Sequence, residues 1–155
     1  MNKTKILMVC LGNICRSPLA EGILKSKVNP DHFEVDSAGT GHWHVGEQPD
    51  PRSIAVGKKF GIDITAQRAR QFKPVDFDRF DIIYVMDASN YKNVTALATT
   101  DTAKKKVKRL LEENPTSPVK DVPDPYYGGD DGFENVFYLI DDACNEIVKN
   151  LKSKE

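Results

Sequence analysis

The 155-residue sequence has no hydrophobic run long enough to cross a membrane. Its first apolar stretch, Ile6 to Val9, is also too short to be the hydrophobic core of a signal peptide, so we expect a cytoplasmic protein that does not bind membranes. There are only three cysteines, an odd number, which argues against a disulfide framework and favours a reducing compartment.

The sequence also lacks an excess of charge of either sign. Its 22 Lys and Arg residues nearly balance 23 Asp and Glu residues, for a formal net charge of -1, so nucleic acid is not an expected partner. It has no internal repeat and no low-complexity segment, and its length predicts one domain over residues 1–155 with a sizeable core. The nucleotide-binding pattern G-x-x-x-x-G-K is absent, which gives nucleotide hydrolysis little support.

A strand, a loop and a helix are predicted in succession over residues 5–24. The apolar run from Ile6 to Val9 stops at Cys10, and a helical pattern starts at Ser17 with Pro18 at the first helical position. A loop placed in this way directs several backbone N–H groups toward one point at the positive end of the helix. That point can bind an anion of the size of a phosphate.

Cys10 and Arg16 stand at the two ends of this loop, with five residues between them. The N–H groups and the guanidinium should favour the thiolate form of Cys10, a nucleophile at neutral pH, while Arg16 can hold two oxygens of a phosphoryl group. Gly12 and Asn13 tolerate a left-handed backbone, and the Ser17 hydroxyl could cap the helix or donate to the Cys10 sulfur. The alternative is that Cys10 is a buried strand-end residue and Arg16 a surface charge.

A second chemical signal lies in the proline-rich loop of residues 115–129. Asp124 stands between two prolines and is followed by Tyr126 and Tyr127. If Cys10 attacks a phosphoryl group, the leaving oxygen needs a proton, which a carboxylic acid on a facing loop can supply. Asp124 is the first candidate, with Asp121 and Asp87 behind it. The alternative is that Asp124 only opens a turn and that both tyrosines only cover core.

The polar loop of residues 41–52 contains the only tryptophan, Trp43, which is expected either to plug the core locally or to lie at the rim of a site. His42 and His44 flank it, but no third ligand stands at a suitable spacing, so a solvated loop is favoured over a metal site. The short basic cluster of residues 67–70 is expected at a solvated surface.

Strands and helices are predicted to alternate along the chain. Strands are expected at residues 32–36 and 81–86, and a strand is preferred to a helix around Val107, Leu110 and Leu111. Helices are expected at residues 51–60, 89 to about 98, and 133–151, with Cys144 in the buried face of the last one. This alternation predicts an α/β fold with a parallel sheet covered on both faces. Ligands of such sheets bind beyond the carboxyl ends of the strands, where the Cys10 loop would lie.

The motifs at residues 10–18, Cys-Leu-Gly-Asn-Ile-Cys-Arg-Ser-Pro, and 124–127, Asp-Pro-Tyr-Tyr, resemble the paired signatures of the low-molecular-weight protein tyrosine phosphatases. Shorter segments at residues 37–40, 43–46, 50–52, 68–71 and 86–90 match in the same order, so the resemblance covers essentially the whole chain. It implies a small four-stranded parallel sheet in flavodoxin-like order, phosphotyrosine-containing proteins as substrates, and no metal or other cofactor. It also fits a monomer or weak homodimer.

The resemblance further implies a role for each site residue. Cys10 would be the nucleophile, Arg16 the phosphate clamp, Asp124 the general acid and base, and Ser17 the stabiliser of the thiolate. Within the loop, Asn13 would hold the unusual backbone and Cys15 would form a reversible disulfide with Cys10. The rest of the site would comprise the phosphate-binding loop (Leu11, Gly12, Asn13, Ile14 and Cys15) and an aromatic entrance (Trp43, Tyr126 and Tyr127).

One departure and three alternatives remain. Gln67 stands where many members of the family carry a histidine near the loop, which leaves the tuning of the site open. Protein-arginine phosphatases on this scaffold carry threonine in place of the apolar Ile14, so phosphotyrosine is preferred. A thiol-dependent arsenate reductase would need further relay cysteines, and Cys144 is a poor candidate. A domain that binds phosphotyrosine without cleaving it is disfavoured by the presence of Cys10, Arg16 and Asp124 together.

Overall fold

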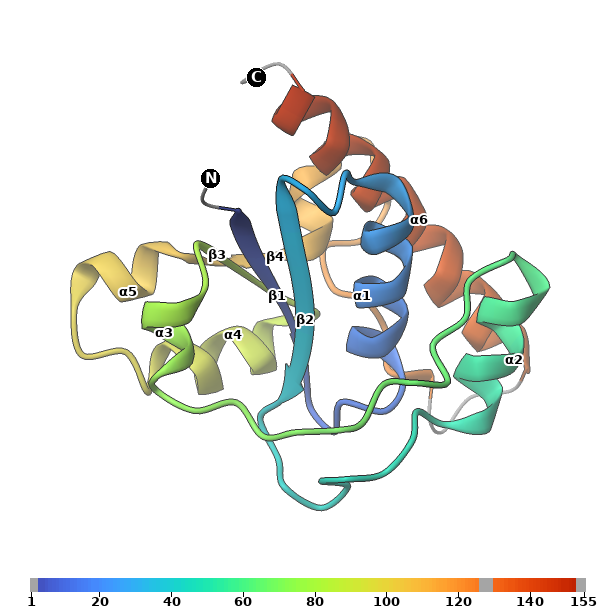
Figure 1. Ribbon diagram of the computed structural model, residues 1–155, viewed down its shortest axis with the longest axis horizontal. Coiled ribbons are helices and arrows are strands. Elements are labelled where there is room, and N and C mark those ends of the chain that lie inside the picture. Colours follow the sequence, from blue (N-terminus) through green and yellow to red (C-terminus); the bar gives the residue numbers. More distant parts are fainter. Residues whose placement is uncertain (1–2, 126–129, 153–155) are drawn as a thin grey trace.

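A four-stranded parallel sheet forms the centre of the computed structural model, which describes residues 3–125 and 130–152 (Figure 1). In spatial order its strands are β2 (Phe33–Gly39), β1 (Thr4–Cys10), β3 (Ile82–Val85) and β4 (Val107–Arg109). All three pairings are parallel. The order 2-1-3-4 is the flavodoxin-like order, so the predicted fold class is confirmed.

Helices cover both faces of the sheet (Figure 1). One face carries α1 (Arg16–Lys27) and α6 (Asp130–Lys152), with α2 (Pro51–Lys59) packed outside them. On the other side lie the short helices α3 (Asp76–Arg79), α4 (Ala88–Thr95) and α5 (Asp101–Lys105). Within residues 3–125 and 130–152, no helix has both the length and the apolar character needed to span a bilayer.

The strand β1 is buried on both faces because its side chains alternate between two cores. Ile6 and Met8 join the core under α1 and α6, whereas Leu7 and Val9 join the core under α3 and α4. A strand that is covered on both faces is expected to be apolar at consecutive positions, and this explains the unbroken run that precedes Cys10.

The structure differs from the sequence predictions at several boundaries. Helix α1 begins at Arg16, so Pro18, predicted at the first helical position, occupies the third, where the missing N–H is still among those without an intrahelical partner. Of the apolar patch predicted as a strand, only Val107 lies in β4, while Leu110 and Leu111 lie in a 3₁₀ helix (Leu110–Glu113). Helices α3 and α5 were not predicted, because both are shorter than two turns.

The register of the sheet brings three strand ends together. Cys10, the last residue of β1, pairs with Gly39 at the end of β2, and Val9 pairs with Val85 at the end of β3. The loops that follow these strands therefore start side by side at the carboxyl edge of the sheet, as predicted for the Cys10 loop.

The buried side of α1 should dominate stability. Leu24→Ala removes a fully buried side chain from the core between the sheet and α6, and it is expected to lower the free energy of unfolding by about 2–5 kcal/mol. The exposed Leu97 is a matched control, and Leu97→Ala should cost less than about 0.5 kcal/mol. Urea unfolding followed by circular dichroism measures both values. Equal losses in the two variants would contradict this account of the core.

Candidate active site

The loop between β1 and α1 curls around the sulfur of Cys10, a residue that is only 2% exposed. The backbone N–H of Asn13 donates to Cys10 Sγ at 3.2 Å, and Ser17 Oγ lies 3.0 Å from the same sulfur. Both groups can donate hydrogen bonds to a thiolate, and such bonds favour the negatively charged form. Of the two uses predicted for the Ser17 hydroxyl, the structure shows the contact with sulfur, since α1 has no side-chain cap.

Asn13 holds the loop in shape with a left-handed backbone, at φ 58°. Its side-chain Nδ2 donates to Ser17 Oγ at 2.8 Å and to Ser37 Oγ at 3.0 Å, and its Oδ1 accepts from the backbone N–H of Arg70 at 3.0 Å. Gly12, the other residue expected to tolerate this conformation, does not adopt it. Its lack of a side chain serves a different purpose, because a Cβ there would lie 3.1 Å from His44.

Arg16 is buried, with 3% exposure, and its guanidinium is fixed from two sides. Nη1 donates to Asp87 Oδ2 at 2.6 Å and to the carbonyl of Val122 at 2.9 Å, while Nη2 lies 3.8 Å from Asp124 Oδ2. Burial by itself lowers the pKa of Arg16, but the charges of Cys10, Asp87 and Asp124 outweigh it and raise the pKa above its ordinary value. Arg16 therefore remains a cation in the site.

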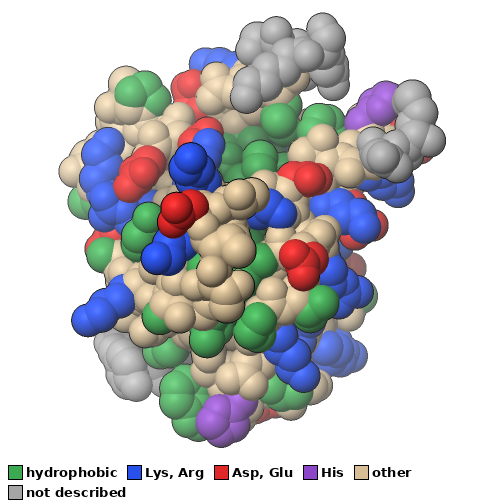
Figure 2. Space-filling view, turned by 90° about the vertical axis from the view of Figure 1, so that its left-hand side faces the viewer, with side chains coloured by type: hydrophobic (Ala, Val, Ile, Leu, Met, Phe, Trp, Pro, Cys, Tyr) green, Lys and Arg blue, Asp and Glu red, His purple; other side chains and the backbone are tan. Residues whose placement is uncertain are grey.

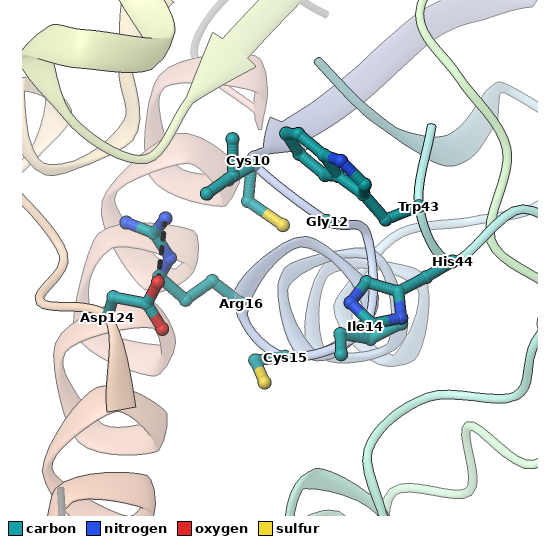
Figure 3. A pocket seen from close by; sticks show the side chains of 9 residues that line it. Cys10, Gly12, Ile14, Cys15, Arg16, Trp43, His44 and Asp124 are labelled. Atoms are coloured by element: carbon teal, nitrogen blue, oxygen red, sulfur yellow. Dashed lines mark ion pairs between the residues drawn. The ribbon is translucent and has the colours of Figure 1, made fainter. Parts of the chain in front are cut away.

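Only one of the three candidate acids lines the site. Asp124 lies beside the Arg16 guanidinium and lines the same cavity (Figure 3). Asp87 caps helix α4, because its Oδ1 accepts from the backbone N–H of Asn90 at 2.8 Å. Its Oδ2 accepts from Arg16. Asp121 accepts instead from the backbone N–H of Ala88 and from Arg109, both at 3.1 Å.

A cavity of about 330 Å³ opens over the Cys10 sulfur (Figure 3). Trp43 lies at its rim with 64% exposure, so the site-rim alternative holds for this residue and the core-plug alternative is wrong. Asn13 and Ser17 support the loop without lining the cavity, and Tyr126 and Tyr127 lie outside the described residues. The lining consists of Cys10, Leu11, Gly12, Ile14, Cys15, Arg16, Trp43, His44 and Asp124.

The positive end of α1 is available to an anion in this cavity. Among the described residues, no acidic side chain lies in its first turn and no side chain caps it, while Cys15 and Arg16 at its start line the cavity. An unoccupied helix N-terminus next to a guanidinium binds a tetrahedral oxyanion well. The site thus combines a thiol sulfur, a cradle suited to an oxyanion and a carboxyl group.

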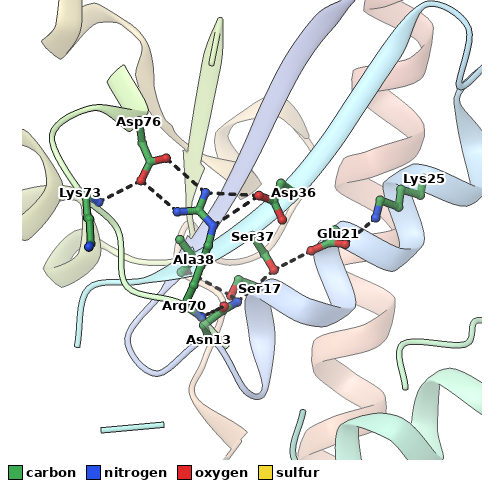
Figure 4. A network of polar contacts seen from close by, with 10 residues as sticks. All are labelled: Asn13, Ser17, Glu21, Lys25, Asp36, Ser37, Ala38, Arg70, Lys73 and Asp76. Atoms are coloured by element: carbon green, nitrogen blue, oxygen red, sulfur yellow. Dashed lines mark hydrogen bonds and ion pairs between the residues drawn. The ribbon is translucent and has the colours of Figure 1, made fainter. Parts of the chain in front are cut away.

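Two residues near the site have positions that the sequence did not predict. His44, considered only as a metal ligand, lines the cavity and its Nδ1 lies 3.0 Å from Glu47 Oε2. Arg70, expected at a solvated surface, forms ion pairs with Asp36 at 3.3 Å and Asp76 at 3.1 Å (Figure 4). Neither position has a local sequence signal, because each depends on how distant loops fold against each other.

A buried polar network supports the loop from behind (Figure 4). Ser37, which accepts from Asn13, donates to Glu21 Oε1 at 2.7 Å, and Glu21 pairs with Lys25 at 2.6 Å. Burial raises the pKa of Glu21, although Lys25 and Ser37 oppose this shift. Gln67 donates to the carbonyl of Pro18 at 3.0 Å, and its Oε1 is buried with no hydrogen-bond partner among the described residues.

Cys15 lies in the same cavity as Cys10, and both are free thiols. Burial is the main cause that raises the pKa of Cys15 to about 12, and the charges of Asp50, Cys10 and Asp124 add to this shift. The hydrogen bond with Ser53 acts in the opposite direction and lowers the pKa. Cys144 is fully buried in α6, as predicted, and burial also raises its pKa. The disulfide between Cys10 and Cys15 stays a prediction.

The three thiols should therefore differ in reactivity. Brief treatment with iodoacetamide at pH 7 is expected to alkylate Cys10 before Cys15 or Cys144, because only the thiolate reacts. A thiol with a pKa of about 12 is almost entirely protonated at neutral pH. Even at pH 9, on the order of one Cys15 thiol in a thousand is ionised. Exposure does not explain the difference, since Cys10 is no more exposed than Cys15.

Tandem mass spectrometry measures the labelling. Fragment ions are needed because Cys10 and Cys15 share the tryptic peptide of residues 6–16. Cys10→Ser is the control and should take up little label. Equal labelling of Cys10 and Cys15 at pH 7 would contradict the assignment.

Comparison with known proteins agrees with this geometry. The family model described as low molecular weight phosphotyrosine protein phosphatase matches residues 5–155. A protein of that name from Schizosaccharomyces pombe is 41% identical over 152 residues, which cover 95% of this chain and 96% of the relative.

Solved structures give the same result. A protein tyrosine phosphatase from Entamoeba histolytica superposes with a TM-score of 0.92 at 37% identity, over 98% of this chain and 99% of the other. A Drosophila protein named as an arginine phosphatase superposes with a TM-score of 0.90 at 34% identity, over 98% and 100% of the two chains. From the family match over nearly its whole length, the chain belongs to the low molecular weight protein tyrosine phosphatases.

Proposed function

We propose that this protein hydrolyses phosphotyrosine in proteins through a phosphocysteine intermediate. The observation that carries the proposal is the position of the Cys10 sulfur at the floor of a cavity whose wall holds both Arg16 and Asp124. Family membership supports the same reaction, because the relatives carry the name of protein tyrosine phosphatases.

In the first step, the Cys10 thiolate attacks phosphorus in line with the leaving oxygen. The S–P bond forms while the P–O bond to the tyrosine breaks, and Asp124 in its acid form donates its proton to the departing phenolate oxygen. Arg16 and the N–H groups at the start of α1 hold the equatorial oxygens, where negative charge must be stabilised.

In the second step, water hydrolyses the phosphocysteine. The Asp124 carboxylate, left by the first step, takes a proton from the attacking water, and the S–P bond breaks to release inorganic phosphate and the thiolate. Hydrogen bonds from the Asn13 N–H and the Ser17 hydroxyl then stabilise the leaving sulfur. The same contacts that make Cys10 a nucleophile thus make it a good leaving group.

The walls of the cavity favour an aromatic ester. Ile14, Leu11 and Trp43 present apolar surface between the sulfur and solvent, where a phenyl ring can pack. Phosphoserine is too short to place its phosphate on a floor that is 2% exposed while its backbone stays outside. Phosphoarginine is the second candidate, because the Drosophila neighbour is named as an arginine phosphatase.

The proposal includes a setting and an assembly state. A catalytic thiol works only when reduced, so a cytoplasmic location suits it best. The cavity is built within one chain, so a monomer or a weak homodimer is sufficient for activity.

Hydrolysis of matched phosphopeptides tests the reaction. With chelator and reductant present, phosphate release is expected from the phosphotyrosine peptide, with much less from the phosphoarginine and phosphoserine peptides. Cys10→Ser should abolish release, because serine oxygen is a far weaker nucleophile and leaving group here. A preference for phosphoarginine would show that Ile14 does not exclude it, and no release from any peptide would refute the proposal.

Replacing the acid should slow turnover without weakening binding. Asp124→Asn keeps the shape of the side chain but cannot donate a proton, so kcat is expected to fall by about 10²–10⁴-fold with KM nearly unchanged. Asp121→Asn is the matched control and should keep most of the activity, since Asp121 lies outside the cavity. Equal losses in the two variants would count against Asp124 as the acid.

A further inference from the structure

A second hollow of about 330 Å³ lies on the other side of the loop that carries Trp43. Trp43 and His44 line the catalytic cavity, whereas Val45, the next residue, lines the second hollow. We call it the flank hollow and define it by its lining: Val45, Arg70, Gln71, Lys73, Val75, Asp76 and Arg79. The two hollows are thus separated by the thickness of one loop.

The dividing loop is tied down, so the two hollows keep their relative positions. Gly46 donates its backbone N–H to the carbonyl of Ala69 at 2.8 Å, and Ala69 donates back to the carbonyl of Glu47 at 2.9 Å. Arg70, the next residue, donates its backbone N–H to Asn13 in the catalytic loop. One segment therefore forms part of the flank hollow and supports the phosphate-binding loop.

The flank hollow is positively charged. Arg70 is neutralised by Asp36 and Asp76, and Asp76 is fully buried with a further hydrogen bond from the Lys73 backbone N–H (Figure 4). The exposed side chains of Lys73 and Arg79 form no ion pair with any residue in the described part of the chain. The three cations and two carboxylates at the hollow sum to a net charge of +1, and the cations outside an ion pair among the described residues are Lys73 and Arg79.

Apolar surface accompanies this charge. Val45 and Val75 line the flank hollow at 57% and 51% exposure, and Leu11 and Trp43 are exposed at the catalytic cavity. These four are half of the exposed large hydrophobic side chains in the described residues, and they border two adjacent hollows. Figure 2 shows the side of the molecule that carries α3 and α5, where hydrophobic side chains lie among basic and acidic ones. A surface of this kind suits a peptide with an acidic side chain.

We propose that the flank hollow binds an acidic side chain, Asp or Glu, of the phosphoprotein substrate while its phosphotyrosine occupies the catalytic cavity. This inference rests on the proposed function, because it deepens the specificity of the same site. The carboxylate pairs with Lys73 and Arg79, and the adjoining chain packs on Val45 and Val75. An extended peptide advances about 3.3 Å per residue, so five positions on either side of the phosphotyrosine cover about 16 Å around the catalytic cavity.

Phosphotyrosine peptides with one glutamate, scanned over these positions against a glutamine parent, test the inference. At low ionic strength, one position should raise kcat/KM by about five-fold, mainly through KM, since a pair of exposed charges has an effect of this size. The gain should shrink at high salt. The double variant Lys73→Glu/Arg79→Glu should lose the preference for glutamate. It should instead hydrolyse a peptide with lysine at the same position faster than the glutamine parent.

Two controls separate local from general effects. Lys58→Glu/Lys92→Glu makes the same change of net charge at exposed positions in α2 and α4 and should keep the glutamate preference. Free phosphotyrosine is too small to reach the flank hollow, so its hydrolysis should be unchanged in both variants.

The outcomes are distinguishable. Normal hydrolysis without a glutamate preference at any position, or a preference that survives Lys73→Glu/Arg79→Glu, overturns the inference and leaves the proposed function intact. A preference lost equally in the control variant also overturns it, since the effect then belongs to the whole-protein charge. Absence of hydrolysis even of free phosphotyrosine overturns the proposed function, and the inference falls with it.

Discussion

The left-handed backbone of Asn13 is the constraint on which the rest of the site depends. A residue other than glycine adopts this conformation only when its surroundings compensate for the cost. At Asn13 the compensation is a set of four hydrogen bonds. Its backbone N–H donates to the Cys10 sulfur and its Nδ2 donates to Ser17 and Ser37, while its Oδ1 accepts from the backbone N–H of Arg70. The turn of the backbone is what points the N–H at the sulfur, so the strain is located where the chemistry needs a donor.

These hydrogen bonds in turn depend on charges held behind the loop. Ser37 is oriented by Glu21, and the segment of Arg70 is held by Asp36 and Asp76. Buried carboxylates are costly unless they are paired, and both Glu21 and Asp76 are paired. Such networks stabilise one arrangement more than they stabilise the fold, because a partly broken network leaves a buried charge unsatisfied. The position of the Cys10 sulfur is therefore fixed from the sheet side by residues that never touch the cavity.

The sequence predicts the parts of this arrangement that are local. The apolar run before Cys10 and the periodic face of α6 each lie within one element, and the spacing from Cys10 to Arg16 spans one short loop; the structure agrees with all three. The role of Arg70 could not be predicted, because its partners Asp36 and Asp76 come from two separate segments. Helix α5 was missed although Thr100 caps it with a hydrogen bond to the Ala103 N–H, since five residues are too few to show a period.

The geometry of Arg16 explains how one residue can be both fixed and available. A guanidinium has five N–H donors, of which two belong to Nη1. In this site Asp87 and the Val122 carbonyl take both Nη1 donors, and the backbone N–H of Val122 donates at 2.8 Å to the carbonyl of Met86, the residue after β3. The opposite edge, formed by Nε and Nη2, is the one that matches two phosphoryl oxygens in a bidentate manner. Lysine in this position could not divide its donors in this way, because its ammonium group has no second edge. The same segment that holds Arg16 through Val122 also carries Asp124 two residues later, so the proposed phosphate clamp and the proposed acid are positioned by one stretch of chain.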